Sequence, residues 1–245
     1  MLSALAALTL ATLSISHAQT PASPPPVSAA QPQKPLQSYP ERAQLWEKAI
    51  AEIEARDQAG AAPTRGAVLF IGSSSIRAWK SLAADFPGLP VYNRGFGGSQ
   101  IPDSTYYANR LLLPFQPRTV VFYAGDNDIA AGHTHEQVVG DFQTFAFKVR
   151  AALPDAKIIF LAIKPSIARW KSQPRIVAAN RAIAGWMASQ PNMTFVDVHT
   201  PMLGADGQPR KELYVGDGLH MTPAGYKLWT SLLAPHLKTE PKPAP

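Results

Sequence analysis

The residues with the clearest chemical potential lie in two short stretches that are far apart in the chain. The first, GSSS at residues 72–75, follows the apolar run 68–71, and the second, DGLH, occupies residues 217–220. A serine hydroxyl becomes a nucleophile when a neighbouring base takes its proton, and imidazole titrates near neutral pH. A carboxylate close to that imidazole can accept its second ring N–H and fix the tautomer. The pattern predicts attack on an acyl carbon, with His220 as the base and Asp217 as its partner.

Two further blocks contain candidate hydrogen-bond donors. NRGFGGSQ at residues 93–100 follows a weak apolar run, and GDND at residues 125–128 follows the apolar run 120–123. The tetrahedral intermediate of acyl transfer carries an oxyanion, which needs preorganised donors. We expect the backbone N–H of Gly98 and the side-chain amide of Asn127 to supply them, together with the N–H of the nucleophilic serine. A glycine at position 98 leaves the backbone open to a substrate.

The elements that must position these blocks are strands and helices in alternation. Apolar runs rich in β-branched and aromatic residues predict strands at 68–71, 91–92, 120–123, 158–163 and 195–198. Apolar stripes at 3.6-residue spacing predict helices at 46–53, 138–149, 176–187 and 224–232, with a capping box of Thr134 and Gln137 before the second. Alternation of this kind predicts a three-layer α/β/α fold with a mostly parallel, flavodoxin-like central sheet of about five strands. Ligands of such sheets bind beyond the carboxyl ends of the strands, where all four blocks should meet.

Together the blocks resemble those of the SGNH (GDSL-like) hydrolase superfamily of esterases and lipases, over residues 68–232. The matching motifs are Asn93-x-Gly95-x-x-Gly98, Gly125-x-Asn127-Asp128 and Asp217-x-x-His220. The family's Gly-Asp-Ser is replaced here by Gly72-Ser73-Ser74, so the acid before the nucleophile is missing.

The resemblance implies a set of roles. Alignment from Gly72 makes Ser74 the nucleophile, with Ser73 as the alternative. The triad is then Ser74, His220 and Asp217, and the oxyanion hole consists of Ser74, Gly98 and Asn127. No cofactor is implied.

The loop IKPSIARW at residues 163–170 follows the strongest strand signal and should also lie at the carboxyl edge of the sheet. Lys164, Arg169 and Trp170 are therefore candidates for a wall of the substrate pocket. The alternative is an ordinary surface loop.

A metal site is the less favoured interpretation of the residues around the third block. His133 and His135 lie near Asp126 and Asp128 in the sequence, but in a loop before a helix, and the acids belong to a block that already has an explanation. We expect no metal.

Composition limits the classes of partner. The chain has no cysteine, which excludes disulfides and thiolate chemistry, and its net charge of +6 is scattered rather than gathered in basic runs. We expect no nucleic-acid partner and no stable membrane insertion; the oligomeric state stays open.

The two ends of the chain differ from its middle. Residues 1–18 are uncharged and mostly apolar and end in a small-x-small motif, which predicts a signal peptide and export to the periplasm or beyond, although no basic residue precedes the apolar run. Residues 19–38 form a Pro/Ala-rich linker, 39–237 the hydrolase-like domain and 238–245 a disordered tail. The alternative for residues 1–18 is an unstructured apolar tail.

The sequence thus predicts a serine esterase that acts on a small-molecule, saccharide or lipid ester. The short loops after the strands favour short acyl groups, acetyl above all. The alternatives are a lysophospholipase or lipase and a binding protein of the same fold without activity.

Overall fold

The computed structural model describes residue 42 and residues 44–237. The predicted signal peptide (1–18), linker (19–38) and tail (238–245) lie outside the described residues, so these assignments and the export that rests on them stay predictions. The described residues all belong to one compact unit.

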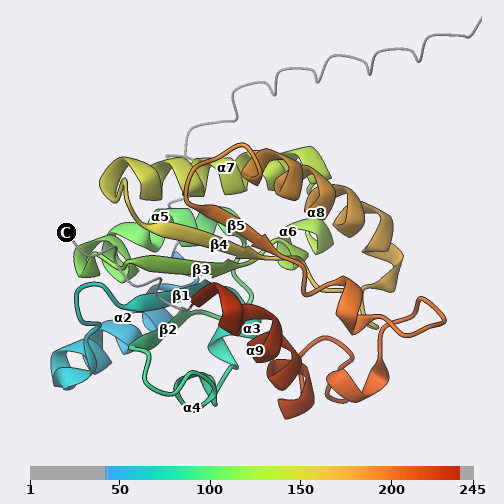
Figure 1. Cartoon of the computed structure of the whole chain (residues 1–245), viewed down its shortest axis with the longest axis horizontal. Coiled ribbons are helices and arrows are strands. Elements are labelled where there is room, and N and C mark those ends of the chain that lie inside the picture. Colours follow the sequence, from blue (N-terminus) through green and yellow to red (C-terminus); the bar gives the residue numbers. More distant parts are fainter. Residues whose placement is uncertain (1–41, 43, 238–245) are drawn as a thin grey trace, which may run out of the picture. The chain divides into compact units, whose positions relative to one another are not determined.

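Five parallel strands form the central sheet in the order β2-β1-β3-β4-β5 (Figure 1). They are β1 (Val68–Gly72), β2 (Val91–Gly95), β3 (Thr119–Tyr123), β4 (Lys157–Leu161) and β5 (Met193–Val196). β1 and β3 are buried at every residue, as strands covered on both faces must be. The predicted three-layer α/β/α fold with a flavodoxin-like sheet is therefore confirmed.

Helices connect the strands. They are α2 (Glu47–Arg56), α3 (Ser74–Arg77), α4 (Leu82–Asp85), α5 (Ile101–Leu111), α6 (Asp126–Ala130), α7 (His135–Ala152), α8 (Gln173–Met187) and α9 (Pro223–Leu237), with the short turns η2 (Asp57–Ala61), η3 (Leu113–Phe115), η4 (Trp170–Ser172), η5 (Thr200–Met202) and η6 (Lys211–Leu213). The predicted capping box is confirmed: Gln137 N–H donates to Thr134 Oγ1 at 3.3 Å, and Thr134 N–H donates to Gln137 Oε1 at 2.8 Å. Of the helices among residues 44–237, none has the length and apolar character that crossing a lipid bilayer requires.

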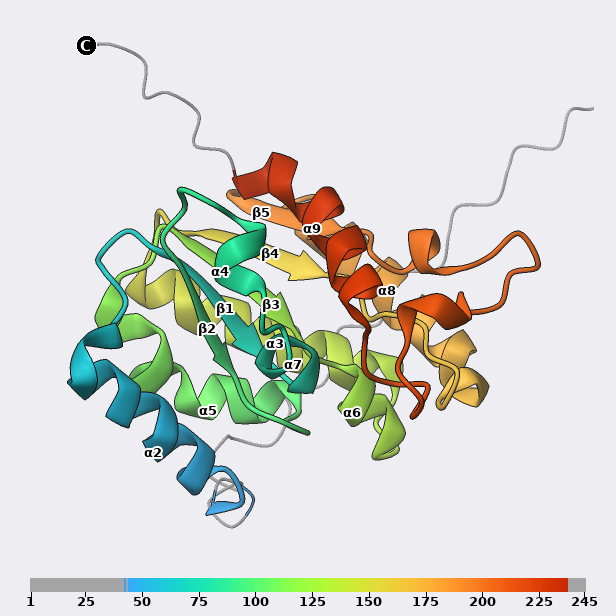
Figure 2. The same ribbon diagram turned by 90° about the horizontal axis from the view of Figure 1, so that it is seen from below.

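Each face of the sheet has its own hydrophobic core. α2, α5, α7 and α8 cover one face, and α3, α4 and α9 cover the other (Figure 2). Representative buried side chains are Ile53, Leu111 and Val149 on the first face and Ile76, Leu82 and Trp229 on the second. Full burial of one such aliphatic side chain stabilises the fold by about 1.5–3 kcal/mol.

Gly72 explains why β1 ends so abruptly. Its φ is +140°, and a Cβ at this position would lie 1.9 Å from the carbonyl oxygen of Tyr123 on β3. Only glycine lets β1 approach β3 this closely and then leave the sheet. The N–H of Ser73 donates to the same Tyr123 carbonyl at 3.0 Å, and Ser74 becomes the first residue of α3. The strand thereby delivers Ser74 to the carboxyl edge of the sheet, beside the point between β1 and β3 where the strand order reverses.

Candidate active site

Ser74, His220 and Asp217 form a continuous chain of hydrogen bonds. The distance from Ser74 Oγ to His220 Nε2 is 3.0 Å, although the two residues are 146 positions apart. On the other side of the ring, His220 Nδ1 lies 2.5 Å from Asp217 Oδ2. This arrangement can remove the proton from the serine hydroxyl and hold the resulting imidazolium.

The turn that contains Asp217 and His220 fixes the carboxylate. Asp217 Oδ1 accepts hydrogen bonds from the N–H groups of Leu219 at 2.8 Å and His220 at 2.9 Å. The hydrogen bond from the His220 ring, and then these two backbone bonds, lower the pKa of Asp217 to about 2. The group is therefore a carboxylate at neutral pH, even though its side chain is 47% exposed.

The three serines of the first block have different surroundings. Ser73 is completely buried, and its Oγ has no hydrogen-bond partner among the described residues. Ser75 is buried too, and its carbonyl accepts a hydrogen bond from the Tyr226 hydroxyl at 2.9 Å. Of the three, Ser74 is the serine whose hydroxyl reaches His220.

Asn127 is held at both ends of its amide. Its Nδ2 donates to the carbonyl of Ser99 at 2.9 Å, and its Oδ1 accepts from Arg169 Nη2 at 2.9 Å. These bonds fix which way the amide faces and leave the second N–H of Nδ2 for another acceptor.

Gly98 and Asn127 both line a cleft that also contains Ser74 and His220. Its φ of +76° strains any residue with a side chain, and a Cβ here would approach the Trp46 ring to 3.1 Å. The requirement for glycine is thus conformational as well as a matter of substrate access.

A cleft of about 680 Å³ opens beside Ser74 and His220. Residues around the start of α2 form its far wall; they include Leu45, Trp46, Lys48 and Glu52. The sequence predicted α2 from an apolar stripe, and Ile50 and Ile53 of that stripe are buried in the core. Trp46 and Ala49 belong to the same stripe but line the cleft, and the stripe did not distinguish them from the core residues.

The three candidate wall residues have separate environments. Arg169 lines the cleft, whereas Trp170 is half-buried and is not among the residues that line it. Lys164 is 1% exposed, and its Nζ lies 3.2 Å from the Tyr123 hydroxyl and 3.3 Å from Asp126 Oδ2. The prediction that Lys164 forms a pocket wall is therefore wrong, because the side chain turns inward to a buried carboxylate.

Asp126 connects Lys164 with the cleft. Its Oδ2 lies 3.3 Å from Lys164 Nζ and 3.2 Å from Arg169 Nη1, and the residue is buried. Arg169 consequently links the buried ion pair of Lys164 and Asp126 to the amide of Asn127 in the cleft. These four residues form a continuous row. Burial lowers the pKa of Lys164, and the negative charge of Asp126 opposes that effect.

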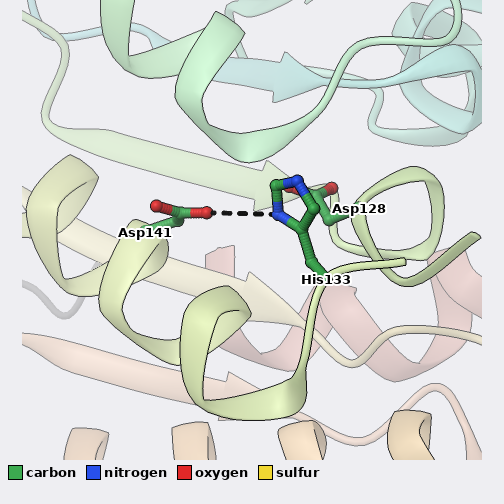
Figure 3. Close-up of side chains that lie close together, drawn as sticks. All are labelled: Asp128, His133 and Asp141. Carbon is green, nitrogen blue, oxygen red and sulfur yellow. Dashed lines mark ion pairs between the residues drawn. The ribbon is translucent and has the colours of Figure 1, made fainter. Parts of the chain in front are cut away.

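The residues considered for a metal site are divided by the structure. Asp126 belongs to the row just described, and His135 pairs with Glu136 at 3.0 Å. Asp128 and His133 do lie together, joined by Asp141 of α7, and none of these three lines the cleft (Figure 3).

The parallel sheet, with serine, glycine, asparagine and histidine gathered at its carboxyl edge, defines the SGNH hydrolase superfamily and confirms the resemblance. The chain belongs to the GDSL-like Lipase/Acylhydrolase family, whose model matches residues 59–228. It is therefore a hydrolase.

Individual relatives are distant. Platelet-activating factor acetylhydrolase IB subunit alpha2 of Gallus gallus is 26% identical over 176 residues, which are 65% of this chain and 70% of the relative. A GDSL-like lipase from Bacteroides thetaiotaomicron VPI-5482 has a TM-score of 0.64 at 21% identity, covering 76% of this chain and 95% of that one. A carbohydrate esterase family 3 structure from Talaromyces cellulolyticus has a TM-score of 0.53 at 21% identity, covering 69% and 95%. The two structures show the shared fold.

Proposed function

We propose that the protein is a serine esterase that hydrolyses carboxylic esters through an acyl-enzyme on Ser74. The observation that carries this proposal is the hydrogen-bonded row of Ser74, His220 and Asp217, with spacings of 3.0 and 2.5 Å, at the edge of an open cleft. A serine in contact with an oriented imidazole is the arrangement that acyl transfer requires.

The reaction follows from the positions of these atoms. His220 Nε2 takes the Ser74 proton while Oγ attacks the carbonyl carbon. The oxyanion then accepts hydrogen bonds from the N–H groups of Gly98 and Ser74 and from the free N–H of Asn127. The imidazolium returns its proton to the leaving alkoxide, and water repeats the sequence to release the acid.

The substrate class that we favour is an ester of a short acyl group, acetyl above all. The Gallus gallus relative is an acetylhydrolase by name, and one structural neighbour is a carbohydrate esterase. p-Nitrophenyl esters of increasing chain length test this choice: we expect kcat/KM to be highest for acetate.

A second candidate is an ester of a lysophospholipid or another lipid. Three basic side chains line the cleft, Lys48, Arg77 and Arg169, and cations of this kind suit a phosphate group. A maximum of kcat/KM at long chains, together with release of fatty acid from a lysophospholipid, would favour this candidate over acetyl esters.

Asn127 offers a direct test of the oxyanion hole. Loss of one such donor typically lowers kcat by about 10²–10³-fold, and we expect Asn127→Ala to show a decrease of this size with little change in KM. Steady-state kinetics on p-nitrophenyl acetate measure it. Asn180→Ala is an unsuitable control, because Asn180 makes two buried bonds to Ile163; Asn109→Ala, at an exposed position of α5 away from the cleft, serves instead.

Arg169 can be tested as a positioning residue for Asn127. Arg169→Met removes the hydrogen bond to Asn127 Oδ1, and we expect kcat on the neutral ester to fall about tenfold, equivalent to about 1.4 kcal/mol, at nearly constant KM. If Arg169 instead binds substrate directly, KM rises while kcat is retained. Arg77→Met, which removes another cleft arginine that makes no hydrogen bond to Asn127, is the matched control.

A further inference from the structure

Asp128, His133 and Asp141 form a cluster on α6, on the loop after it and on α7. One ligand atom from each residue lies within 4.8 Å of the other two. His133 Nδ1 and Asp141 Oδ2 are 3.7 Å apart, too far for a hydrogen bond, and the Asp128 carboxylate lies close behind the imidazole ring (Figure 3).

Two atoms of this cluster are buried without a hydrogen-bond partner. Asp128 is completely buried; its Oδ1 accepts from the N–H of Ile101 at 3.0 Å, but its Oδ2 has no partner among the described residues. The same holds for His133 Nδ1. Buried polar atoms are usually satisfied by protein, water or an ion, so each of these two atoms indicates a partner that the described residues do not supply.

The cluster also lacks a compensating cation. Among the described residues, no lysine or arginine forms an ion pair with Asp128 or Asp141. The positive charge of Arg42 acts on His133, but this guanidinium is already paired with Asp103 at 3.0 Å. Burial of a carboxylate without a partner is costly, and Asp128 is completely buried.

We propose that Asp128, His133 and Asp141 bind a divalent transition-metal ion of the zinc type. The ligands are one oxygen from each carboxylate and Nδ1 of the imidazole, and the two carboxylates balance the ionic charge. An imidazole nitrogen favours zinc, cobalt or nickel over calcium and magnesium, which prefer six or more oxygen ligands.

The spacing fits an ion of this size. Zinc bonds of ~2.0–2.2 Å in a tetrahedron place neighbouring ligand atoms ~3.3–3.6 Å apart. The 3.7 Å between His133 and Asp141 is close to this value, and the other separations are no more than 4.8 Å, so closing them requires a movement of about 1 Å at most.

The role that follows is structural. Asp128 also binds the N–H of Ile101 at the start of α5, and its carbonyl accepts the N–H of His133 at 3.0 Å. An ion would therefore clamp α5, α6 and α7 together directly behind Asn127, without entering the cleft. We expect it to raise Tm rather than to take part in ester hydrolysis.

The test uses the full chain after removal of metal with EDTA. Calorimetric titration with ZnCl2 should show one ion per chain, and Tm should rise by about 5 °C or more at a hundredfold excess of free zinc over Kd. CoCl2 should give the visible absorption of a nitrogen- and oxygen-ligated cobalt ion.

Substitution of the ligands localises the ion. Asp141→Asn and His133→Asn should each weaken zinc binding at least tenfold and abolish the rise in Tm. Asp141→Asn keeps the shape of the side chain and removes a buried charge, so its Tm in EDTA should not fall. His135→Asn, which changes an exposed imidazole two positions from His133, should bind zinc as the wild type does.

Three results would overturn the proposal: no zinc binding by the wild type, unchanged binding in Asp141→Asn and His133→Asn, or loss of binding in His135→Asn. If the wild type binds no zinc, Asp128 is instead a protonated carboxyl, and the cluster holds no ion. Because the readouts are binding and Tm, they are independent of whether the esterase proposal holds.

Discussion

Ser74→Ala is expected to lower kcat on p-nitrophenyl acetate by about 10⁶-fold, the loss that removal of a catalytic serine causes in other triad hydrolases. The physical reason is that Ser74 Oγ is the hydroxyl 3.0 Å from His220 Nε2, and alanine leaves the imidazole with no nucleophile to activate. The variant should fold normally, since Ser74 is only partly buried and the change removes a single atom. Steady-state kinetics measure the fall in kcat, and the circular-dichroism spectrum shows whether the variant is folded.

Ser73→Ala is the matched control for this experiment. Within the described part of the chain Ser73 Oγ has no hydrogen-bond partner, so its removal should change kcat by only about threefold. A fluorophosphonate gives an independent readout, because it labels an activated serine covalently. Trypsin releases residues 66–77 as one peptide with all three serines, and fragment ions should place the adduct on Ser74. If Ser73→Ala is inactive and Ser74→Ala active, the nucleophile is Ser73 and the proposed geometry is wrong.

The strands could be predicted well where the sheet buries both of their faces. β1, β3 and most of β4 stand out because their residues are apolar in continuous runs. β2 was recognised only at Val91 and Tyr92, because the strand continues through Asn93 and Arg94. Arg94 is buried but pairs with Asp57 at 2.8 Å, a contact that a local pattern cannot reveal.

The ends of β4 and β5 show a different limit. The apolar run 158–163 predicts a strand that extends two residues past the end of β4 at Leu161. Ala162 and Ile163 are still buried, but the ladder with β5 has already ended at Leu161 and Val196. Hydrophobicity reports burial, whereas strand bounds depend on the partner strand.

The candidate site was predictable where a block directly follows a strand, as the blocks with Ser74, Gly98 and Asn127 do. Parallel strands end at one edge, so these three residues had to meet there. His220 lies well past the end of β5, so its place in the site was predicted from its motif and not from a strand. Contributions from elements marked by neither a strand nor a motif were missed. The cleft wall around Trp46 belongs to α2, and Asp141, the third member of the buried cluster, lies inside α7 among residues of a surface helix pattern.

Lys164 and Arg169 show why a loop sequence alone does not assign roles. Both are basic residues of one short loop, and both reach Asp126. Lys164 turns inward because Tyr123 and Asp126 offer it oxygen atoms, while Arg169 is long enough to pair with Asp126 and still reach Asn127. Which of the two side chains is buried and which lines the cleft is therefore decided by their partners on β3 and α6.

Asp217→Asn is expected to reduce kcat/KM by about 10⁴-fold while leaving the fold intact. The asparagine keeps the shape of the side chain, and its oxygen can still accept the N–H groups of Leu219 and His220. Its amide nitrogen, however, would face His220 Nδ1 as a donor and force the ring proton onto Nε2. Nε2 could then no longer accept the proton of Ser74, so the serine would lose its base.

The control for Asp217→Asn is the same substitution at a second aspartate in a similar turn. Asp206→Asn supplies it, because Asp206 Oδ1 accepts the N–H of Gln208 at 3.0 Å but forms no ion pair with a histidine among the described residues. We expect this control to keep wild-type kcat/KM and Tm. Fluorophosphonate labelling of Asp217→Asn should also slow in proportion to kcat/KM, since both reactions need the same activated hydroxyl. If Asp217→Asn keeps more than about a tenth of wild-type activity, His220 must be oriented by another group, and the 2.5 Å contact does not serve catalysis.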